Sequence, residues 1–330
     1  MTSLAVLAAM VQATDTVSSI FAPVSTPAIK ERDLSMLVLA LSAIVFVVVG
    51  GLIAYNLAHF RAPAGDQGTE PPQVYGSAQV EAAWTVIPLV IIVVLMLATA
   101  RVIQEVQAAP QPANAVEVTI VGRQWWWEIR YPKLGIVTAN ELHVPVSDSS
   151  VHRPTWLTLE SADVSHSFWI PRLAGKTDVI PNRTNRTWVE PFATGTYLGQ
   201  CAEYCGTQHA HMLLRVVVET PEQFARWVEQ QRKAPAADPA VEQGRRTFLG
   251  TACISCHTVA GTVANGRYGP DLTHLMARAT LGAGVVPNTR EKLRAWVKNP
   301  DDLKRGALMP AMQLDDEQLD QLVDYLLTLR

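Results

Sequence analysis

Two long stretches without charged side chains constrain this chain more than any other feature. No Asp, Glu, Lys or Arg occurs over the 27 residues from Leu34 to Phe60. As a helix this stretch reaches about 40 Å, more than the roughly 30 Å hydrocarbon core of a bilayer. A second uncharged run covers the 19 residues from Ala82 to Ala100. We therefore expect a transmembrane hairpin over residues 34–107, with spans at about 34–60 and 82–104.

The composition agrees with a membrane-anchored but otherwise globular chain. Charged residues make up 17% of the 330 residues and hydrophobic residues 48%, whereas soluble domains are roughly 25% charged. The 27 basic and 30 acidic side chains give a net charge of −3, which provides no general attraction to nucleic acid. We expect a membrane as one partner and no nucleic-acid partner.

Segments rich in Pro and Ala predict where the rest of the chain divides. Residues 108–115 (AAPQPANA) and 233–239 (KAPAADP) have the composition of linkers. They predict one domain over residues 112–232 and a second over residues 238–330. Residues 1–33 form an N-terminal segment, in which residues 1–13 are apolar and are either a cleaved leader or a retained tail, since they lack the basic start of a signal peptide.

The four cysteines form two close pairs, Cys201 with Cys205 and Cys253 with Cys256. Four are too few for a disulfide scaffold, and such short spacings are more typical of metal or haem binding. The two pairs fall in different predicted domains. Each therefore predicts a separate site.

The first pair lies in a domain with strand-like patterns over residues 116–220, for which we expect a small antiparallel sandwich. The segment CAEYCGTQHAHM contains five residues with soft or imidazole donor atoms, and a sixth, His166, lies 35 residues before Cys201. Thiolate, thioether and imidazole together favour copper, and two thiolates can bridge two copper ions. A zinc site is the chemical alternative, which leaves Met212 unused. The candidate ligands are Cys201, Cys205, His209, Met212 and His166; His211 points to the other face of an extended chain.

The second pair belongs to the haem-attachment sequence C-x-x-C-H, with Cys253 and Cys256 for the thioether bonds and His257 as an iron ligand. Helices are expected over residues 238–250 and 315–330. The domain resembles the class I cytochromes c, which carry an axial Met beside a Pro before the last helix. That resemblance implies Met309 as the sixth ligand, with Met312 as the alternative. Met/His ligation raises the haem potential and suits electron transfer.

From the first span to about residue 220, the sequence resembles subunit II of cytochrome c oxidase. The spacing around the first cysteine pair is that of the family's binuclear copper centre, called CuA. The resemblance implies two copper ions held by His166, Cys201, Glu203 through its backbone carbonyl, Cys205, His209 and Met212. The implied fold is a two-helix hairpin, then a cupredoxin-like β-sandwich, then an all-α cytochrome c domain.

The same resemblance implies roles for further residues. In GRQWWWEIRY, Trp125 corresponds to the tryptophan through which electrons reach the copper, although a core aromatic is the alternative. Glu81 corresponds to the cytoplasmic opening of a proton path, with an interfacial carboxylate as the alternative. Glu203 and Asp178 correspond to acidic residues near a magnesium site shared with subunit I, and for Asp178 a solvated loop carboxylate is the alternative.

The combination is similar to subunit II of the caa-type haem-copper oxidases. It implies that electrons pass from haem c through CuA to haem a of subunit I, where oxygen is reduced to water and protons are pumped. Subunits I and III and an upstream cytochrome c, or a respiratory complex that carries one, are the implied partners. A short linker between the domains keeps the haem at high effective concentration near the copper.

Two other functions compete with this interpretation. A thioredoxin-like copper chaperone has an anchor and C-x-x-x-C, but it leaves the haem unexplained. A component of a nitrous-oxide or nitric-oxide reductase can carry CuA or a fused haem c. Because c-type haem is normally attached outside the cytoplasm, we expect a bacterial cell membrane location with both termini and both metal domains on the periplasmic side.

Overall fold

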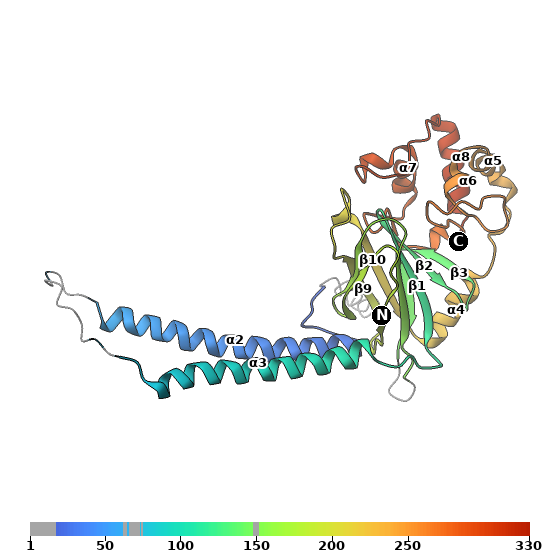
Figure 1. The fold of residues 1–330 in the computed structure, drawn as a ribbon. Helices are drawn as coiled ribbons and strands as arrows, with labels where there is room; N and C mark the ends of the chain where they lie inside the picture. Colours follow the sequence, from blue (N-terminus) through green and yellow to red (C-terminus); the bar gives the residue numbers. More distant parts are fainter. Residues whose placement is uncertain (1–17, 62–64, 66–72, 74, 148–151) are drawn as a thin grey trace, which may run out of the picture. The chain divides into compact units, whose positions relative to one another are not determined.

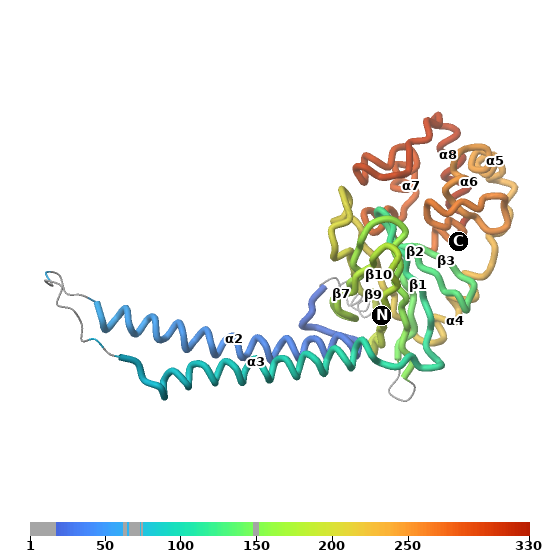
Figure 2. The backbone as a smooth tube through the Cα atoms, in the orientation of Figure 1, coloured from blue at the N-terminus to red at the C-terminus, as the bar shows by residue number. Residues whose placement is uncertain are grey.

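The computed structural model describes residues 18–61, 65, 73, 75–147 and 152–330 (Figure 1). The expected leader at residues 1–13 lies outside these residues. The chain forms two compact units, one over Ile29–Ala109 and one that joins the chain up to Ala28 with Pro110–Arg330. The first unit is a helical hairpin. The second, which we call the large unit, holds a β-sandwich followed by a helical domain, as the backbone trace in Figure 2 shows.

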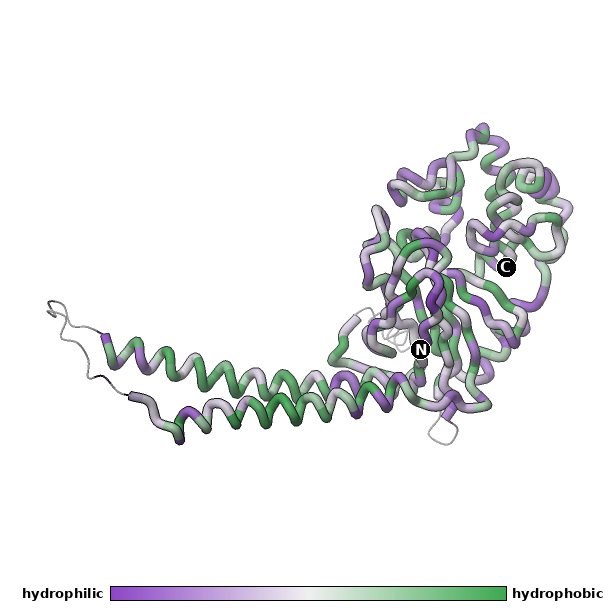
Figure 3. Tube along the Cα trace, in the orientation of Figure 1, coloured by the Kyte–Doolittle hydropathy of each residue, from purple (hydrophilic) through white to green (hydrophobic). Residues whose placement is uncertain are grey.

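Helices α2 (Thr26–His59) and α3 (Ala78–Gln107) form the hairpin. The mean hydropathy of their most apolar windows is 2.9 and 2.7, and Figure 3 shows apolar residues along both. Their 34 and 30 residues give lengths of about 50 and 45 Å. The helices are longer than the predicted spans, because their charged ends extend beyond the apolar stretch. In these ends Glu105 of α3 forms an ion pair with Lys30 of α2. It forms a second with Arg101 of α3, whose Nε lies 2.9 Å from Glu105 Oε1.

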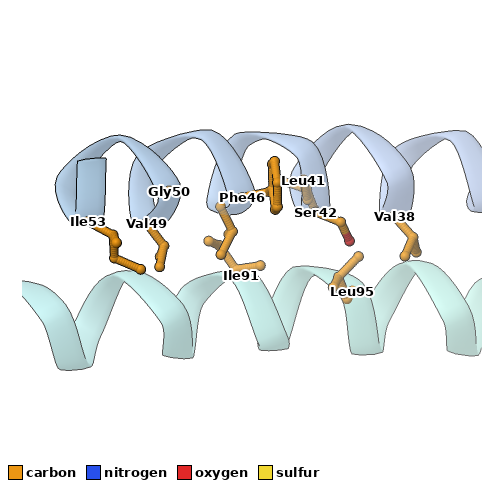
Figure 4. Close-up of a pocket in the computed structure, with 10 residues that line it drawn as sticks. Val38, Leu41, Ser42, Phe46, Val49, Gly50, Ile53, Ile91 and Leu95 are labelled. Carbon is orange, nitrogen blue, oxygen red and sulfur yellow. The ribbon is translucent and has the colours of Figure 1, made fainter. Parts of the chain in front are cut away.

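The two helices leave an apolar groove between them (Figure 4). Most of its lining comes from α2, and the side chains Ile91 and Leu95 come from α3. Ser42 contributes the single hydroxyl of this lining. The remaining lining residues are Val38, Leu41, Val45, Phe46, Val49, Gly50 and Ile53.

The β-sandwich consists of two five-stranded sheets, with strand orders β3-β2-β1-β5-β8 and β4-β10-β9-β6-β7. The strands are β1 (Val116–Arg123), β2 (Trp126–Tyr131), β3 (Ile136–Ala139), β4 (Glu141–Pro145), β5 (Thr155–Ser161), β6 (His166–Ile170), β7 (Ala174–Val179), β8 (Asn185–Val189), β9 (Gly195–Cys201) and β10 (Leu213–Glu219). Alternation places Leu214, Val216 and Val218 of β10 in the core, as expected for a strand with one buried face.

The expectation of a wholly antiparallel sandwich is wrong for two strand pairs. Strand β1 runs parallel to β5, and β4 runs parallel to β10. In both pairs the two strands are neighbours in the sheet, but other strands lie between them in the sequence. Non-consecutive neighbours are free to run in the same direction, and the alternating pattern of side chains is the same for either direction.

Helix α4 (Pro221–Gln231) closes the sandwich and was not among the expected elements. Thr220 and Gln223 form a reciprocal capping box at its start, with Pro at the first helical position. Phe224 and Trp227 join the sandwich core. The sequence T-P-E-Q carried the signal for this helix.

The helical domain contains α5 (Glu242–Gly250), α6 (Cys253–Cys256), the short hairpin β11 (Thr280–Leu281) and β12 (Val286–Pro287), α7 (Arg290–Lys298) and α8 (Asp316–Leu327). The helix expected at 238–250 begins only at Glu242, because residues 239–241 form a 3₁₀ turn capped by Asp238. The final helix has the expected buried face, and Asp315 caps it. That face is made by Leu319, Leu322, Val323 and Leu326.

Close contact between α5 and α8 depends on Gly244. A Cβ at this position would lie 1.9 Å from the carbonyl oxygen of Gln321. Phe248 and Tyr325 pack beside it, with ring centroids 5.7 Å apart. The first and last helices of the domain therefore bring its two ends together around one core.

Candidate metal and haem sites

Five of the six predicted ligands lie in one connection between adjacent strands. Strand β9 ends at Cys201, and the chain returns to β10 after Met212; we call residues 201–212 the cysteine loop. Within it Gly206 has a φ of +115°, a conformation that L side chains rarely adopt. His166 is supplied by the start of β6, the strand paired with β9.

The two thiols lie at the centre of the cluster. The Sγ atoms of Cys201 and Cys205 are 3.8 Å apart. His166 Nδ1 lies 3.9 Å from Cys201 Sγ, and all three ligand atoms lie within 4.8 Å of one another. The three side chains are buried, with exposed fractions of 4%, 3% and 0% for Cys201, Cys205 and His166. A pair of thiolates at this separation can bridge metal ions.

The other predicted ligands flank the same pair. His209 Nδ1 lies 3.6 Å from Cys205 Sγ, and Met212 Sδ lies 3.8 Å from it. The backbone oxygen of Glu203 lies 3.2 Å from Cys201 Sγ. Each thiol thus has an imidazole on its own side, and the loop adds one thioether and one carbonyl oxygen. His211 is directed elsewhere, with Nδ1 at 2.6 Å from Gln208 Oε1.

The electrostatics of the pair favour one anionic sulfur even without a metal. The hydrogen bond between the two cysteine side chains lowers the pKa of Cys201 to about 3, against the opposing effect of burial. The same shared proton raises the pKa of Cys205. Thiolates are the metal-binding form of cysteine. The surroundings therefore favour the thiolate form of Cys201, and a bound cation favours loss of the proton from Cys205.

Asp163 orients His166, and the sequence analysis did not include it. Its Oδ1 lies 2.8 Å from His166 Nε2, and the backbone amides of Gln124 and Val164 donate to the same carboxylate at 2.7 Å each. Burial opposes ionisation of Asp163, but these hydrogen bonds outweigh it and lower its pKa. His166 Nδ1 is thereby aimed at the thiols, an outer-shell arrangement common around metal-binding histidines. Its position three residues before the histidine was the only signal in the sequence.

Trp125 contacts the cysteine loop directly. Its indole Nε1 donates to the carbonyl oxygen of Cys205 at 3.0 Å, and Gln124 Nε2 donates to the same oxygen at 2.7 Å. A Cβ on Gly206 would come within 3.2 Å of the indole ring. The half-buried indole therefore lies against the backbone of one candidate ligand, and its role in electron entry stays a prediction.

The predicted acidic residues lie outside the thiol cluster. The Glu203 side chain is exposed on the cysteine loop, and Asp178 is exposed on β7, opposite Ser167 of β6. Glu81 is in the first turn of α3, where its backbone amide donates to Ser77 at 2.9 Å and its side chain is exposed. The magnesium site near Glu203 and Asp178 and the proton path at Glu81 therefore stay predictions.

The haem-attachment residues share one short turn. Cys253 and Cys256 begin and end α6, both half-buried, and His257 follows at once. His257 Nδ1 donates to the Pro270 carbonyl at 2.7 Å, and among the described residues no partner is found for Nε2. Burial lowers the pKa of His257, which favours the neutral, metal-binding imidazole. These features fit a covalently attached haem with Nε2 as its ligand.

The surroundings of this turn also fit such a group. A Cβ on Gly269 would lie 2.5 Å from Cε1 of the His257 ring, so the chain must pass the ring without a side chain. Cys253 and Ile254 of the turn pack against the domain core but are only partly buried, and so is Leu272, whose amide donates to the Thr258 carbonyl at 2.9 Å. This leaves apolar surface for a macrocycle.

Of the three methionines, Met276 packs against the core and its amide donates to the Leu329 carbonyl at 2.8 Å. Met309 and Met312 are both half-buried in the segment before α8. Within the part of the chain that the structure describes, neither has a contact that distinguishes it as the iron ligand, so Met309 stays a prediction.

Three family models match consecutive parts of the chain. The model of the transmembrane domain of cytochrome c oxidase subunit II matches residues 15–102, and that of the periplasmic domain of the same subunit matches residues 150–220. The cytochrome c model matches residues 241–330. Together they follow the order of the hairpin, the sandwich and the helical domain.

Curated relatives extend over most of the chain. A cytochrome c oxidase subunit 2 of Alkalihalophilus pseudofirmus is 34% identical over 90% of this chain and 86% of its own length. A protein of the same name from Bacillus subtilis is 30% identical over 92% of this chain and 89% of its own. A crystal structure of the periplasmic domain of subunit II of the cytochrome oxidase of Bradyrhizobium japonicum matches 37% of this chain and 96% of that domain, at 31% identity and a TM-score of 0.34.

Proposed function

Because the chain belongs to the cytochrome c oxidase subunit II family and ends in a cytochrome c domain, we propose that it is the electron-transfer subunit of a proton-pumping haem-copper oxidase of the caa type. Electrons are taken up at a haem c in the helical domain and delivered through a CuA centre to haem a of subunit I, which reduces oxygen to water. The chain is anchored by a two-span hairpin.

The geometry of the cysteine loop carries this proposal. Two buried thiols 3.8 Å apart have an imidazole on either side, and the Met212 thioether lies 3.8 Å from one of them. A zinc site with two cysteines and two histidines does not need this thioether, whereas a copper site uses it. When bound, the copper pair supplies a one-electron carrier whose charge is shared by two metals.

Six residues of the chain would hold this centre. Cys201 and Cys205 would supply the thiolates, His166 and His209 would supply one imidazole each, and Met212 and the Glu203 carbonyl would complete the set. Asp163 holds the His166 ring by its Nε2 at 2.8 Å. A rigid ligand set keeps reorganisation small when an electron arrives, which favours fast transfer over catalysis.

In the helical domain, Cys253 and Cys256 would form the thioether bonds, and His257 would bind the iron through Nε2 while its Nδ1 donates to the Pro270 carbonyl. We assign the sixth ligand to Met309. Trp125, in contact with the Cys205 carbonyl, provides the route by which electrons reach the copper.

The remaining assignments complete the proposed assembly. Both termini and both metal domains face the periplasm of a bacterial cell membrane, and subunits I and III are the partners within the oxidase. An upstream cytochrome c, or a respiratory complex that carries one, reduces the haem. Glu203 and Asp178 lie near a magnesium site shared with subunit I. The predicted domain boundaries 112–232 and 238–330 belong to the same proposal.

Glu81 opens the proton path on the cytoplasmic side in this proposal. Glu81→Gln should then slow oxidase turnover while copper and haem contents stay at wild-type levels. Unchanged turnover in the purified complex would assign Glu81 to the membrane interface instead.

Low-temperature EPR of the full-length chain in detergent, with copper and iron analysis, tests the central assignment. After copper loading and haem maturation, we expect a multiline mixed-valence copper signal and about two coppers per haem. A single-copper signal, or zinc in place of copper, alongside a normal low-spin haem would overturn the CuA assignment and favour a chaperone or structural site.

A further inference from the structure

Lys304 is a buried lysine at the contact between the sandwich and the helical domain. It lies five residues before Met309, and its exposed fraction is 5%. Its Nζ donates to three backbone carbonyls: Trp125 at 2.7 Å, His211 at 2.8 Å and Gly282 at 2.8 Å. An ammonium group has three donors, and each is used here.

The three acceptors come from both domains. Trp125 precedes β2 and His211 belongs to the cysteine loop, so two carbonyls are part of the sandwich. Gly282 belongs to the tip of the β11–β12 hairpin in the helical domain. Among the described residues, no carboxylate forms an ion pair with Lys304. A buried cation without a counter-ion is costly, and this burial lowers the pKa of Lys304 to about 7.

A second connection joins the same hairpin to the cysteine loop. The amide of Leu213, the residue after Met212, donates to the carbonyl of Ala283 at 3.1 Å. Gly284 has a φ of +89°, and a Cβ there would lie 2.8 Å from Cβ of Leu213. The hairpin tip therefore fits against the backbone next to a candidate copper ligand, with no room for a larger residue.

Two further contacts between the sandwich and the helical domain lie near Lys304. Gln208 of the cysteine loop donates through Nε2 to the Arg305 carbonyl. Glu141 of β4 accepts the amides of Ala279 and Thr280 at 2.8 and 3.2 Å through Oε1. Gln208 and Glu141 are both buried, with exposed fractions of 5% and 4%. Each of these buried polar side chains therefore has its hydrogen-bond partner in the helical domain.

We propose that Lys304 is a positioning residue that locks the helical domain onto the cysteine loop, so that haem and copper exchange electrons from one fixed docked geometry. The alternative is a tethered domain that must meet the sandwich by diffusion before each transfer. In the transfer one electron leaves ferrous haem, which becomes ferric, and reduces the oxidised copper pair by one electron. The kinetic part of this proposal rests on the proposed function, whereas the docking itself does not.

The docking makes a distinct prediction for solvent conditions. Exposed charge pairs weaken as salt rises, but buried contacts are screened much less. Transfer from a locked geometry should be insensitive to ionic strength and to solvent viscosity. Transfer that waits for a tethered encounter should slow as viscosity increases.

The docking is tested first without any metal signal, by amide hydrogen exchange of the full-length chain in detergent. Lys304→Met removes the three donors but keeps the length of the side chain. We expect the peptide that contains Leu213 to exchange at least tenfold faster in this variant. Lys298→Met, an exposed lysine of α7 with 61% of its side chain accessible, is the control and should match the wild type. If the exchange rate of the Leu213 peptide in Lys304→Met is within twofold of the wild-type rate, Lys304 does not fix the docking of the helical domain.

The second test measures transfer from haem to copper in the metal-loaded full chain, after photoreduction of the haem by a flash-excited ruthenium complex. The wild-type rate should be independent of added glycerol. In Lys304→Met it should fall at least tenfold and decrease with viscosity, while the haem spectrum and copper EPR stay normal. A rate within twofold of the wild type would contradict the role of Lys304.

A second variant keeps the lysine and disturbs the same contact from the other side. Gly284→Val places a branched side chain against Leu213 and should produce the same faster exchange and viscosity-dependent rate. If Lys304→Met does not fold, the Gly284→Val variant tests the docking instead. An absent copper signal in the wild type would count against the proposed function, whereas wild-type exchange at Leu213 in Gly284→Val would count against the lock alone.

Discussion

The cysteine loop and the haem-attachment turn each present two cysteines, but the protein builds them differently. Cys201 and Cys205 are almost completely buried, and their partner His166 comes from another strand 35 residues earlier in the sequence. Cys253 and Cys256 are half-buried on one helical turn, and His257 is the next residue. The first site is thus assembled by the sheet, whereas the second is defined by consecutive residues.

This difference has a physical reason. A copper centre without a covalently attached frame needs its donor atoms in place, and strand pairing between β6 and β9 positions His166 next to Cys201. A covalently attached haem brings its own rigid frame, so the protein needs to supply two thiols, one imidazole and partly exposed apolar surface. We therefore expect the copper site to depend on distant residues and the haem site mainly on nearby ones.

The sharpest separation of the two sites comes from Cys201→Ser. Loss of one bridging thiolate should abolish the mixed-valence copper signal completely, because a serine hydroxyl is a poor soft-metal ligand. The haem spectrum should stay that of the wild type. Low-temperature EPR and optical spectra of the same sample check both. A normal binuclear signal in this variant would contradict the assignment of the bridge.

The reciprocal test is Met309→Leu. It should remove the absorption of Met-to-iron ligation and lower the haem potential, because thioether ligation raises it. The copper EPR signal should not change. Met312→Leu is the matched control, measured by redox titration of the haem. If Met312→Leu alone changes the ligation, the sixth ligand is Met312.

Asp163→Ala asks whether the copper site depends on a residue that does not bind metal. Without the carboxylate, His166 loses the partner at 2.8 Å from Nε2, and copper affinity should fall by about 10–100-fold. Competitive titration with a copper chelator measures this change. Glu229→Ala, an exposed site on α4, should leave copper affinity as in the wild type. An unchanged affinity for Asp163→Ala would mean that β6 alone orients the ring.

The smallest effect should come from Gly244→Ala, which probes how far the haem site depends on packing elsewhere in its domain. The added Cβ meets the Gln321 carbonyl oxygen at 1.9 Å, so α5 and α8 must separate at a cost of about 1–3 kcal/mol. Denaturant unfolding followed by haem absorbance measures the loss. Gly250→Ala, where nothing lies within 4 Å, is the control and should unfold like the wild type.

Much of the architecture could be predicted, because the residue pattern within a short segment is enough to predict a helix. The uncharged runs predicted both membrane helices, and the buried face of the last helix is where its apolar spacing placed it. Helices α4 and α7 were missed although Thr220 and Thr289 cap them. Strand direction was mistaken for β1–β5 and β4–β10, because side-chain alternation has the same period in parallel and antiparallel pairs.

The sequence by itself determined the chemistry of this protein: an apolar hairpin, a cluster of soft ligands and a haem-attachment motif, each set by residue types at short spacing. Only the tertiary structure decided that Asp163 orients His166, that Trp125 lies on the Cys205 carbonyl and that Lys304 joins two domains. These contacts end largely on backbone carbonyls and amides. Every residue carries such groups, so no sequence pattern marks which of them a distant side chain will reach.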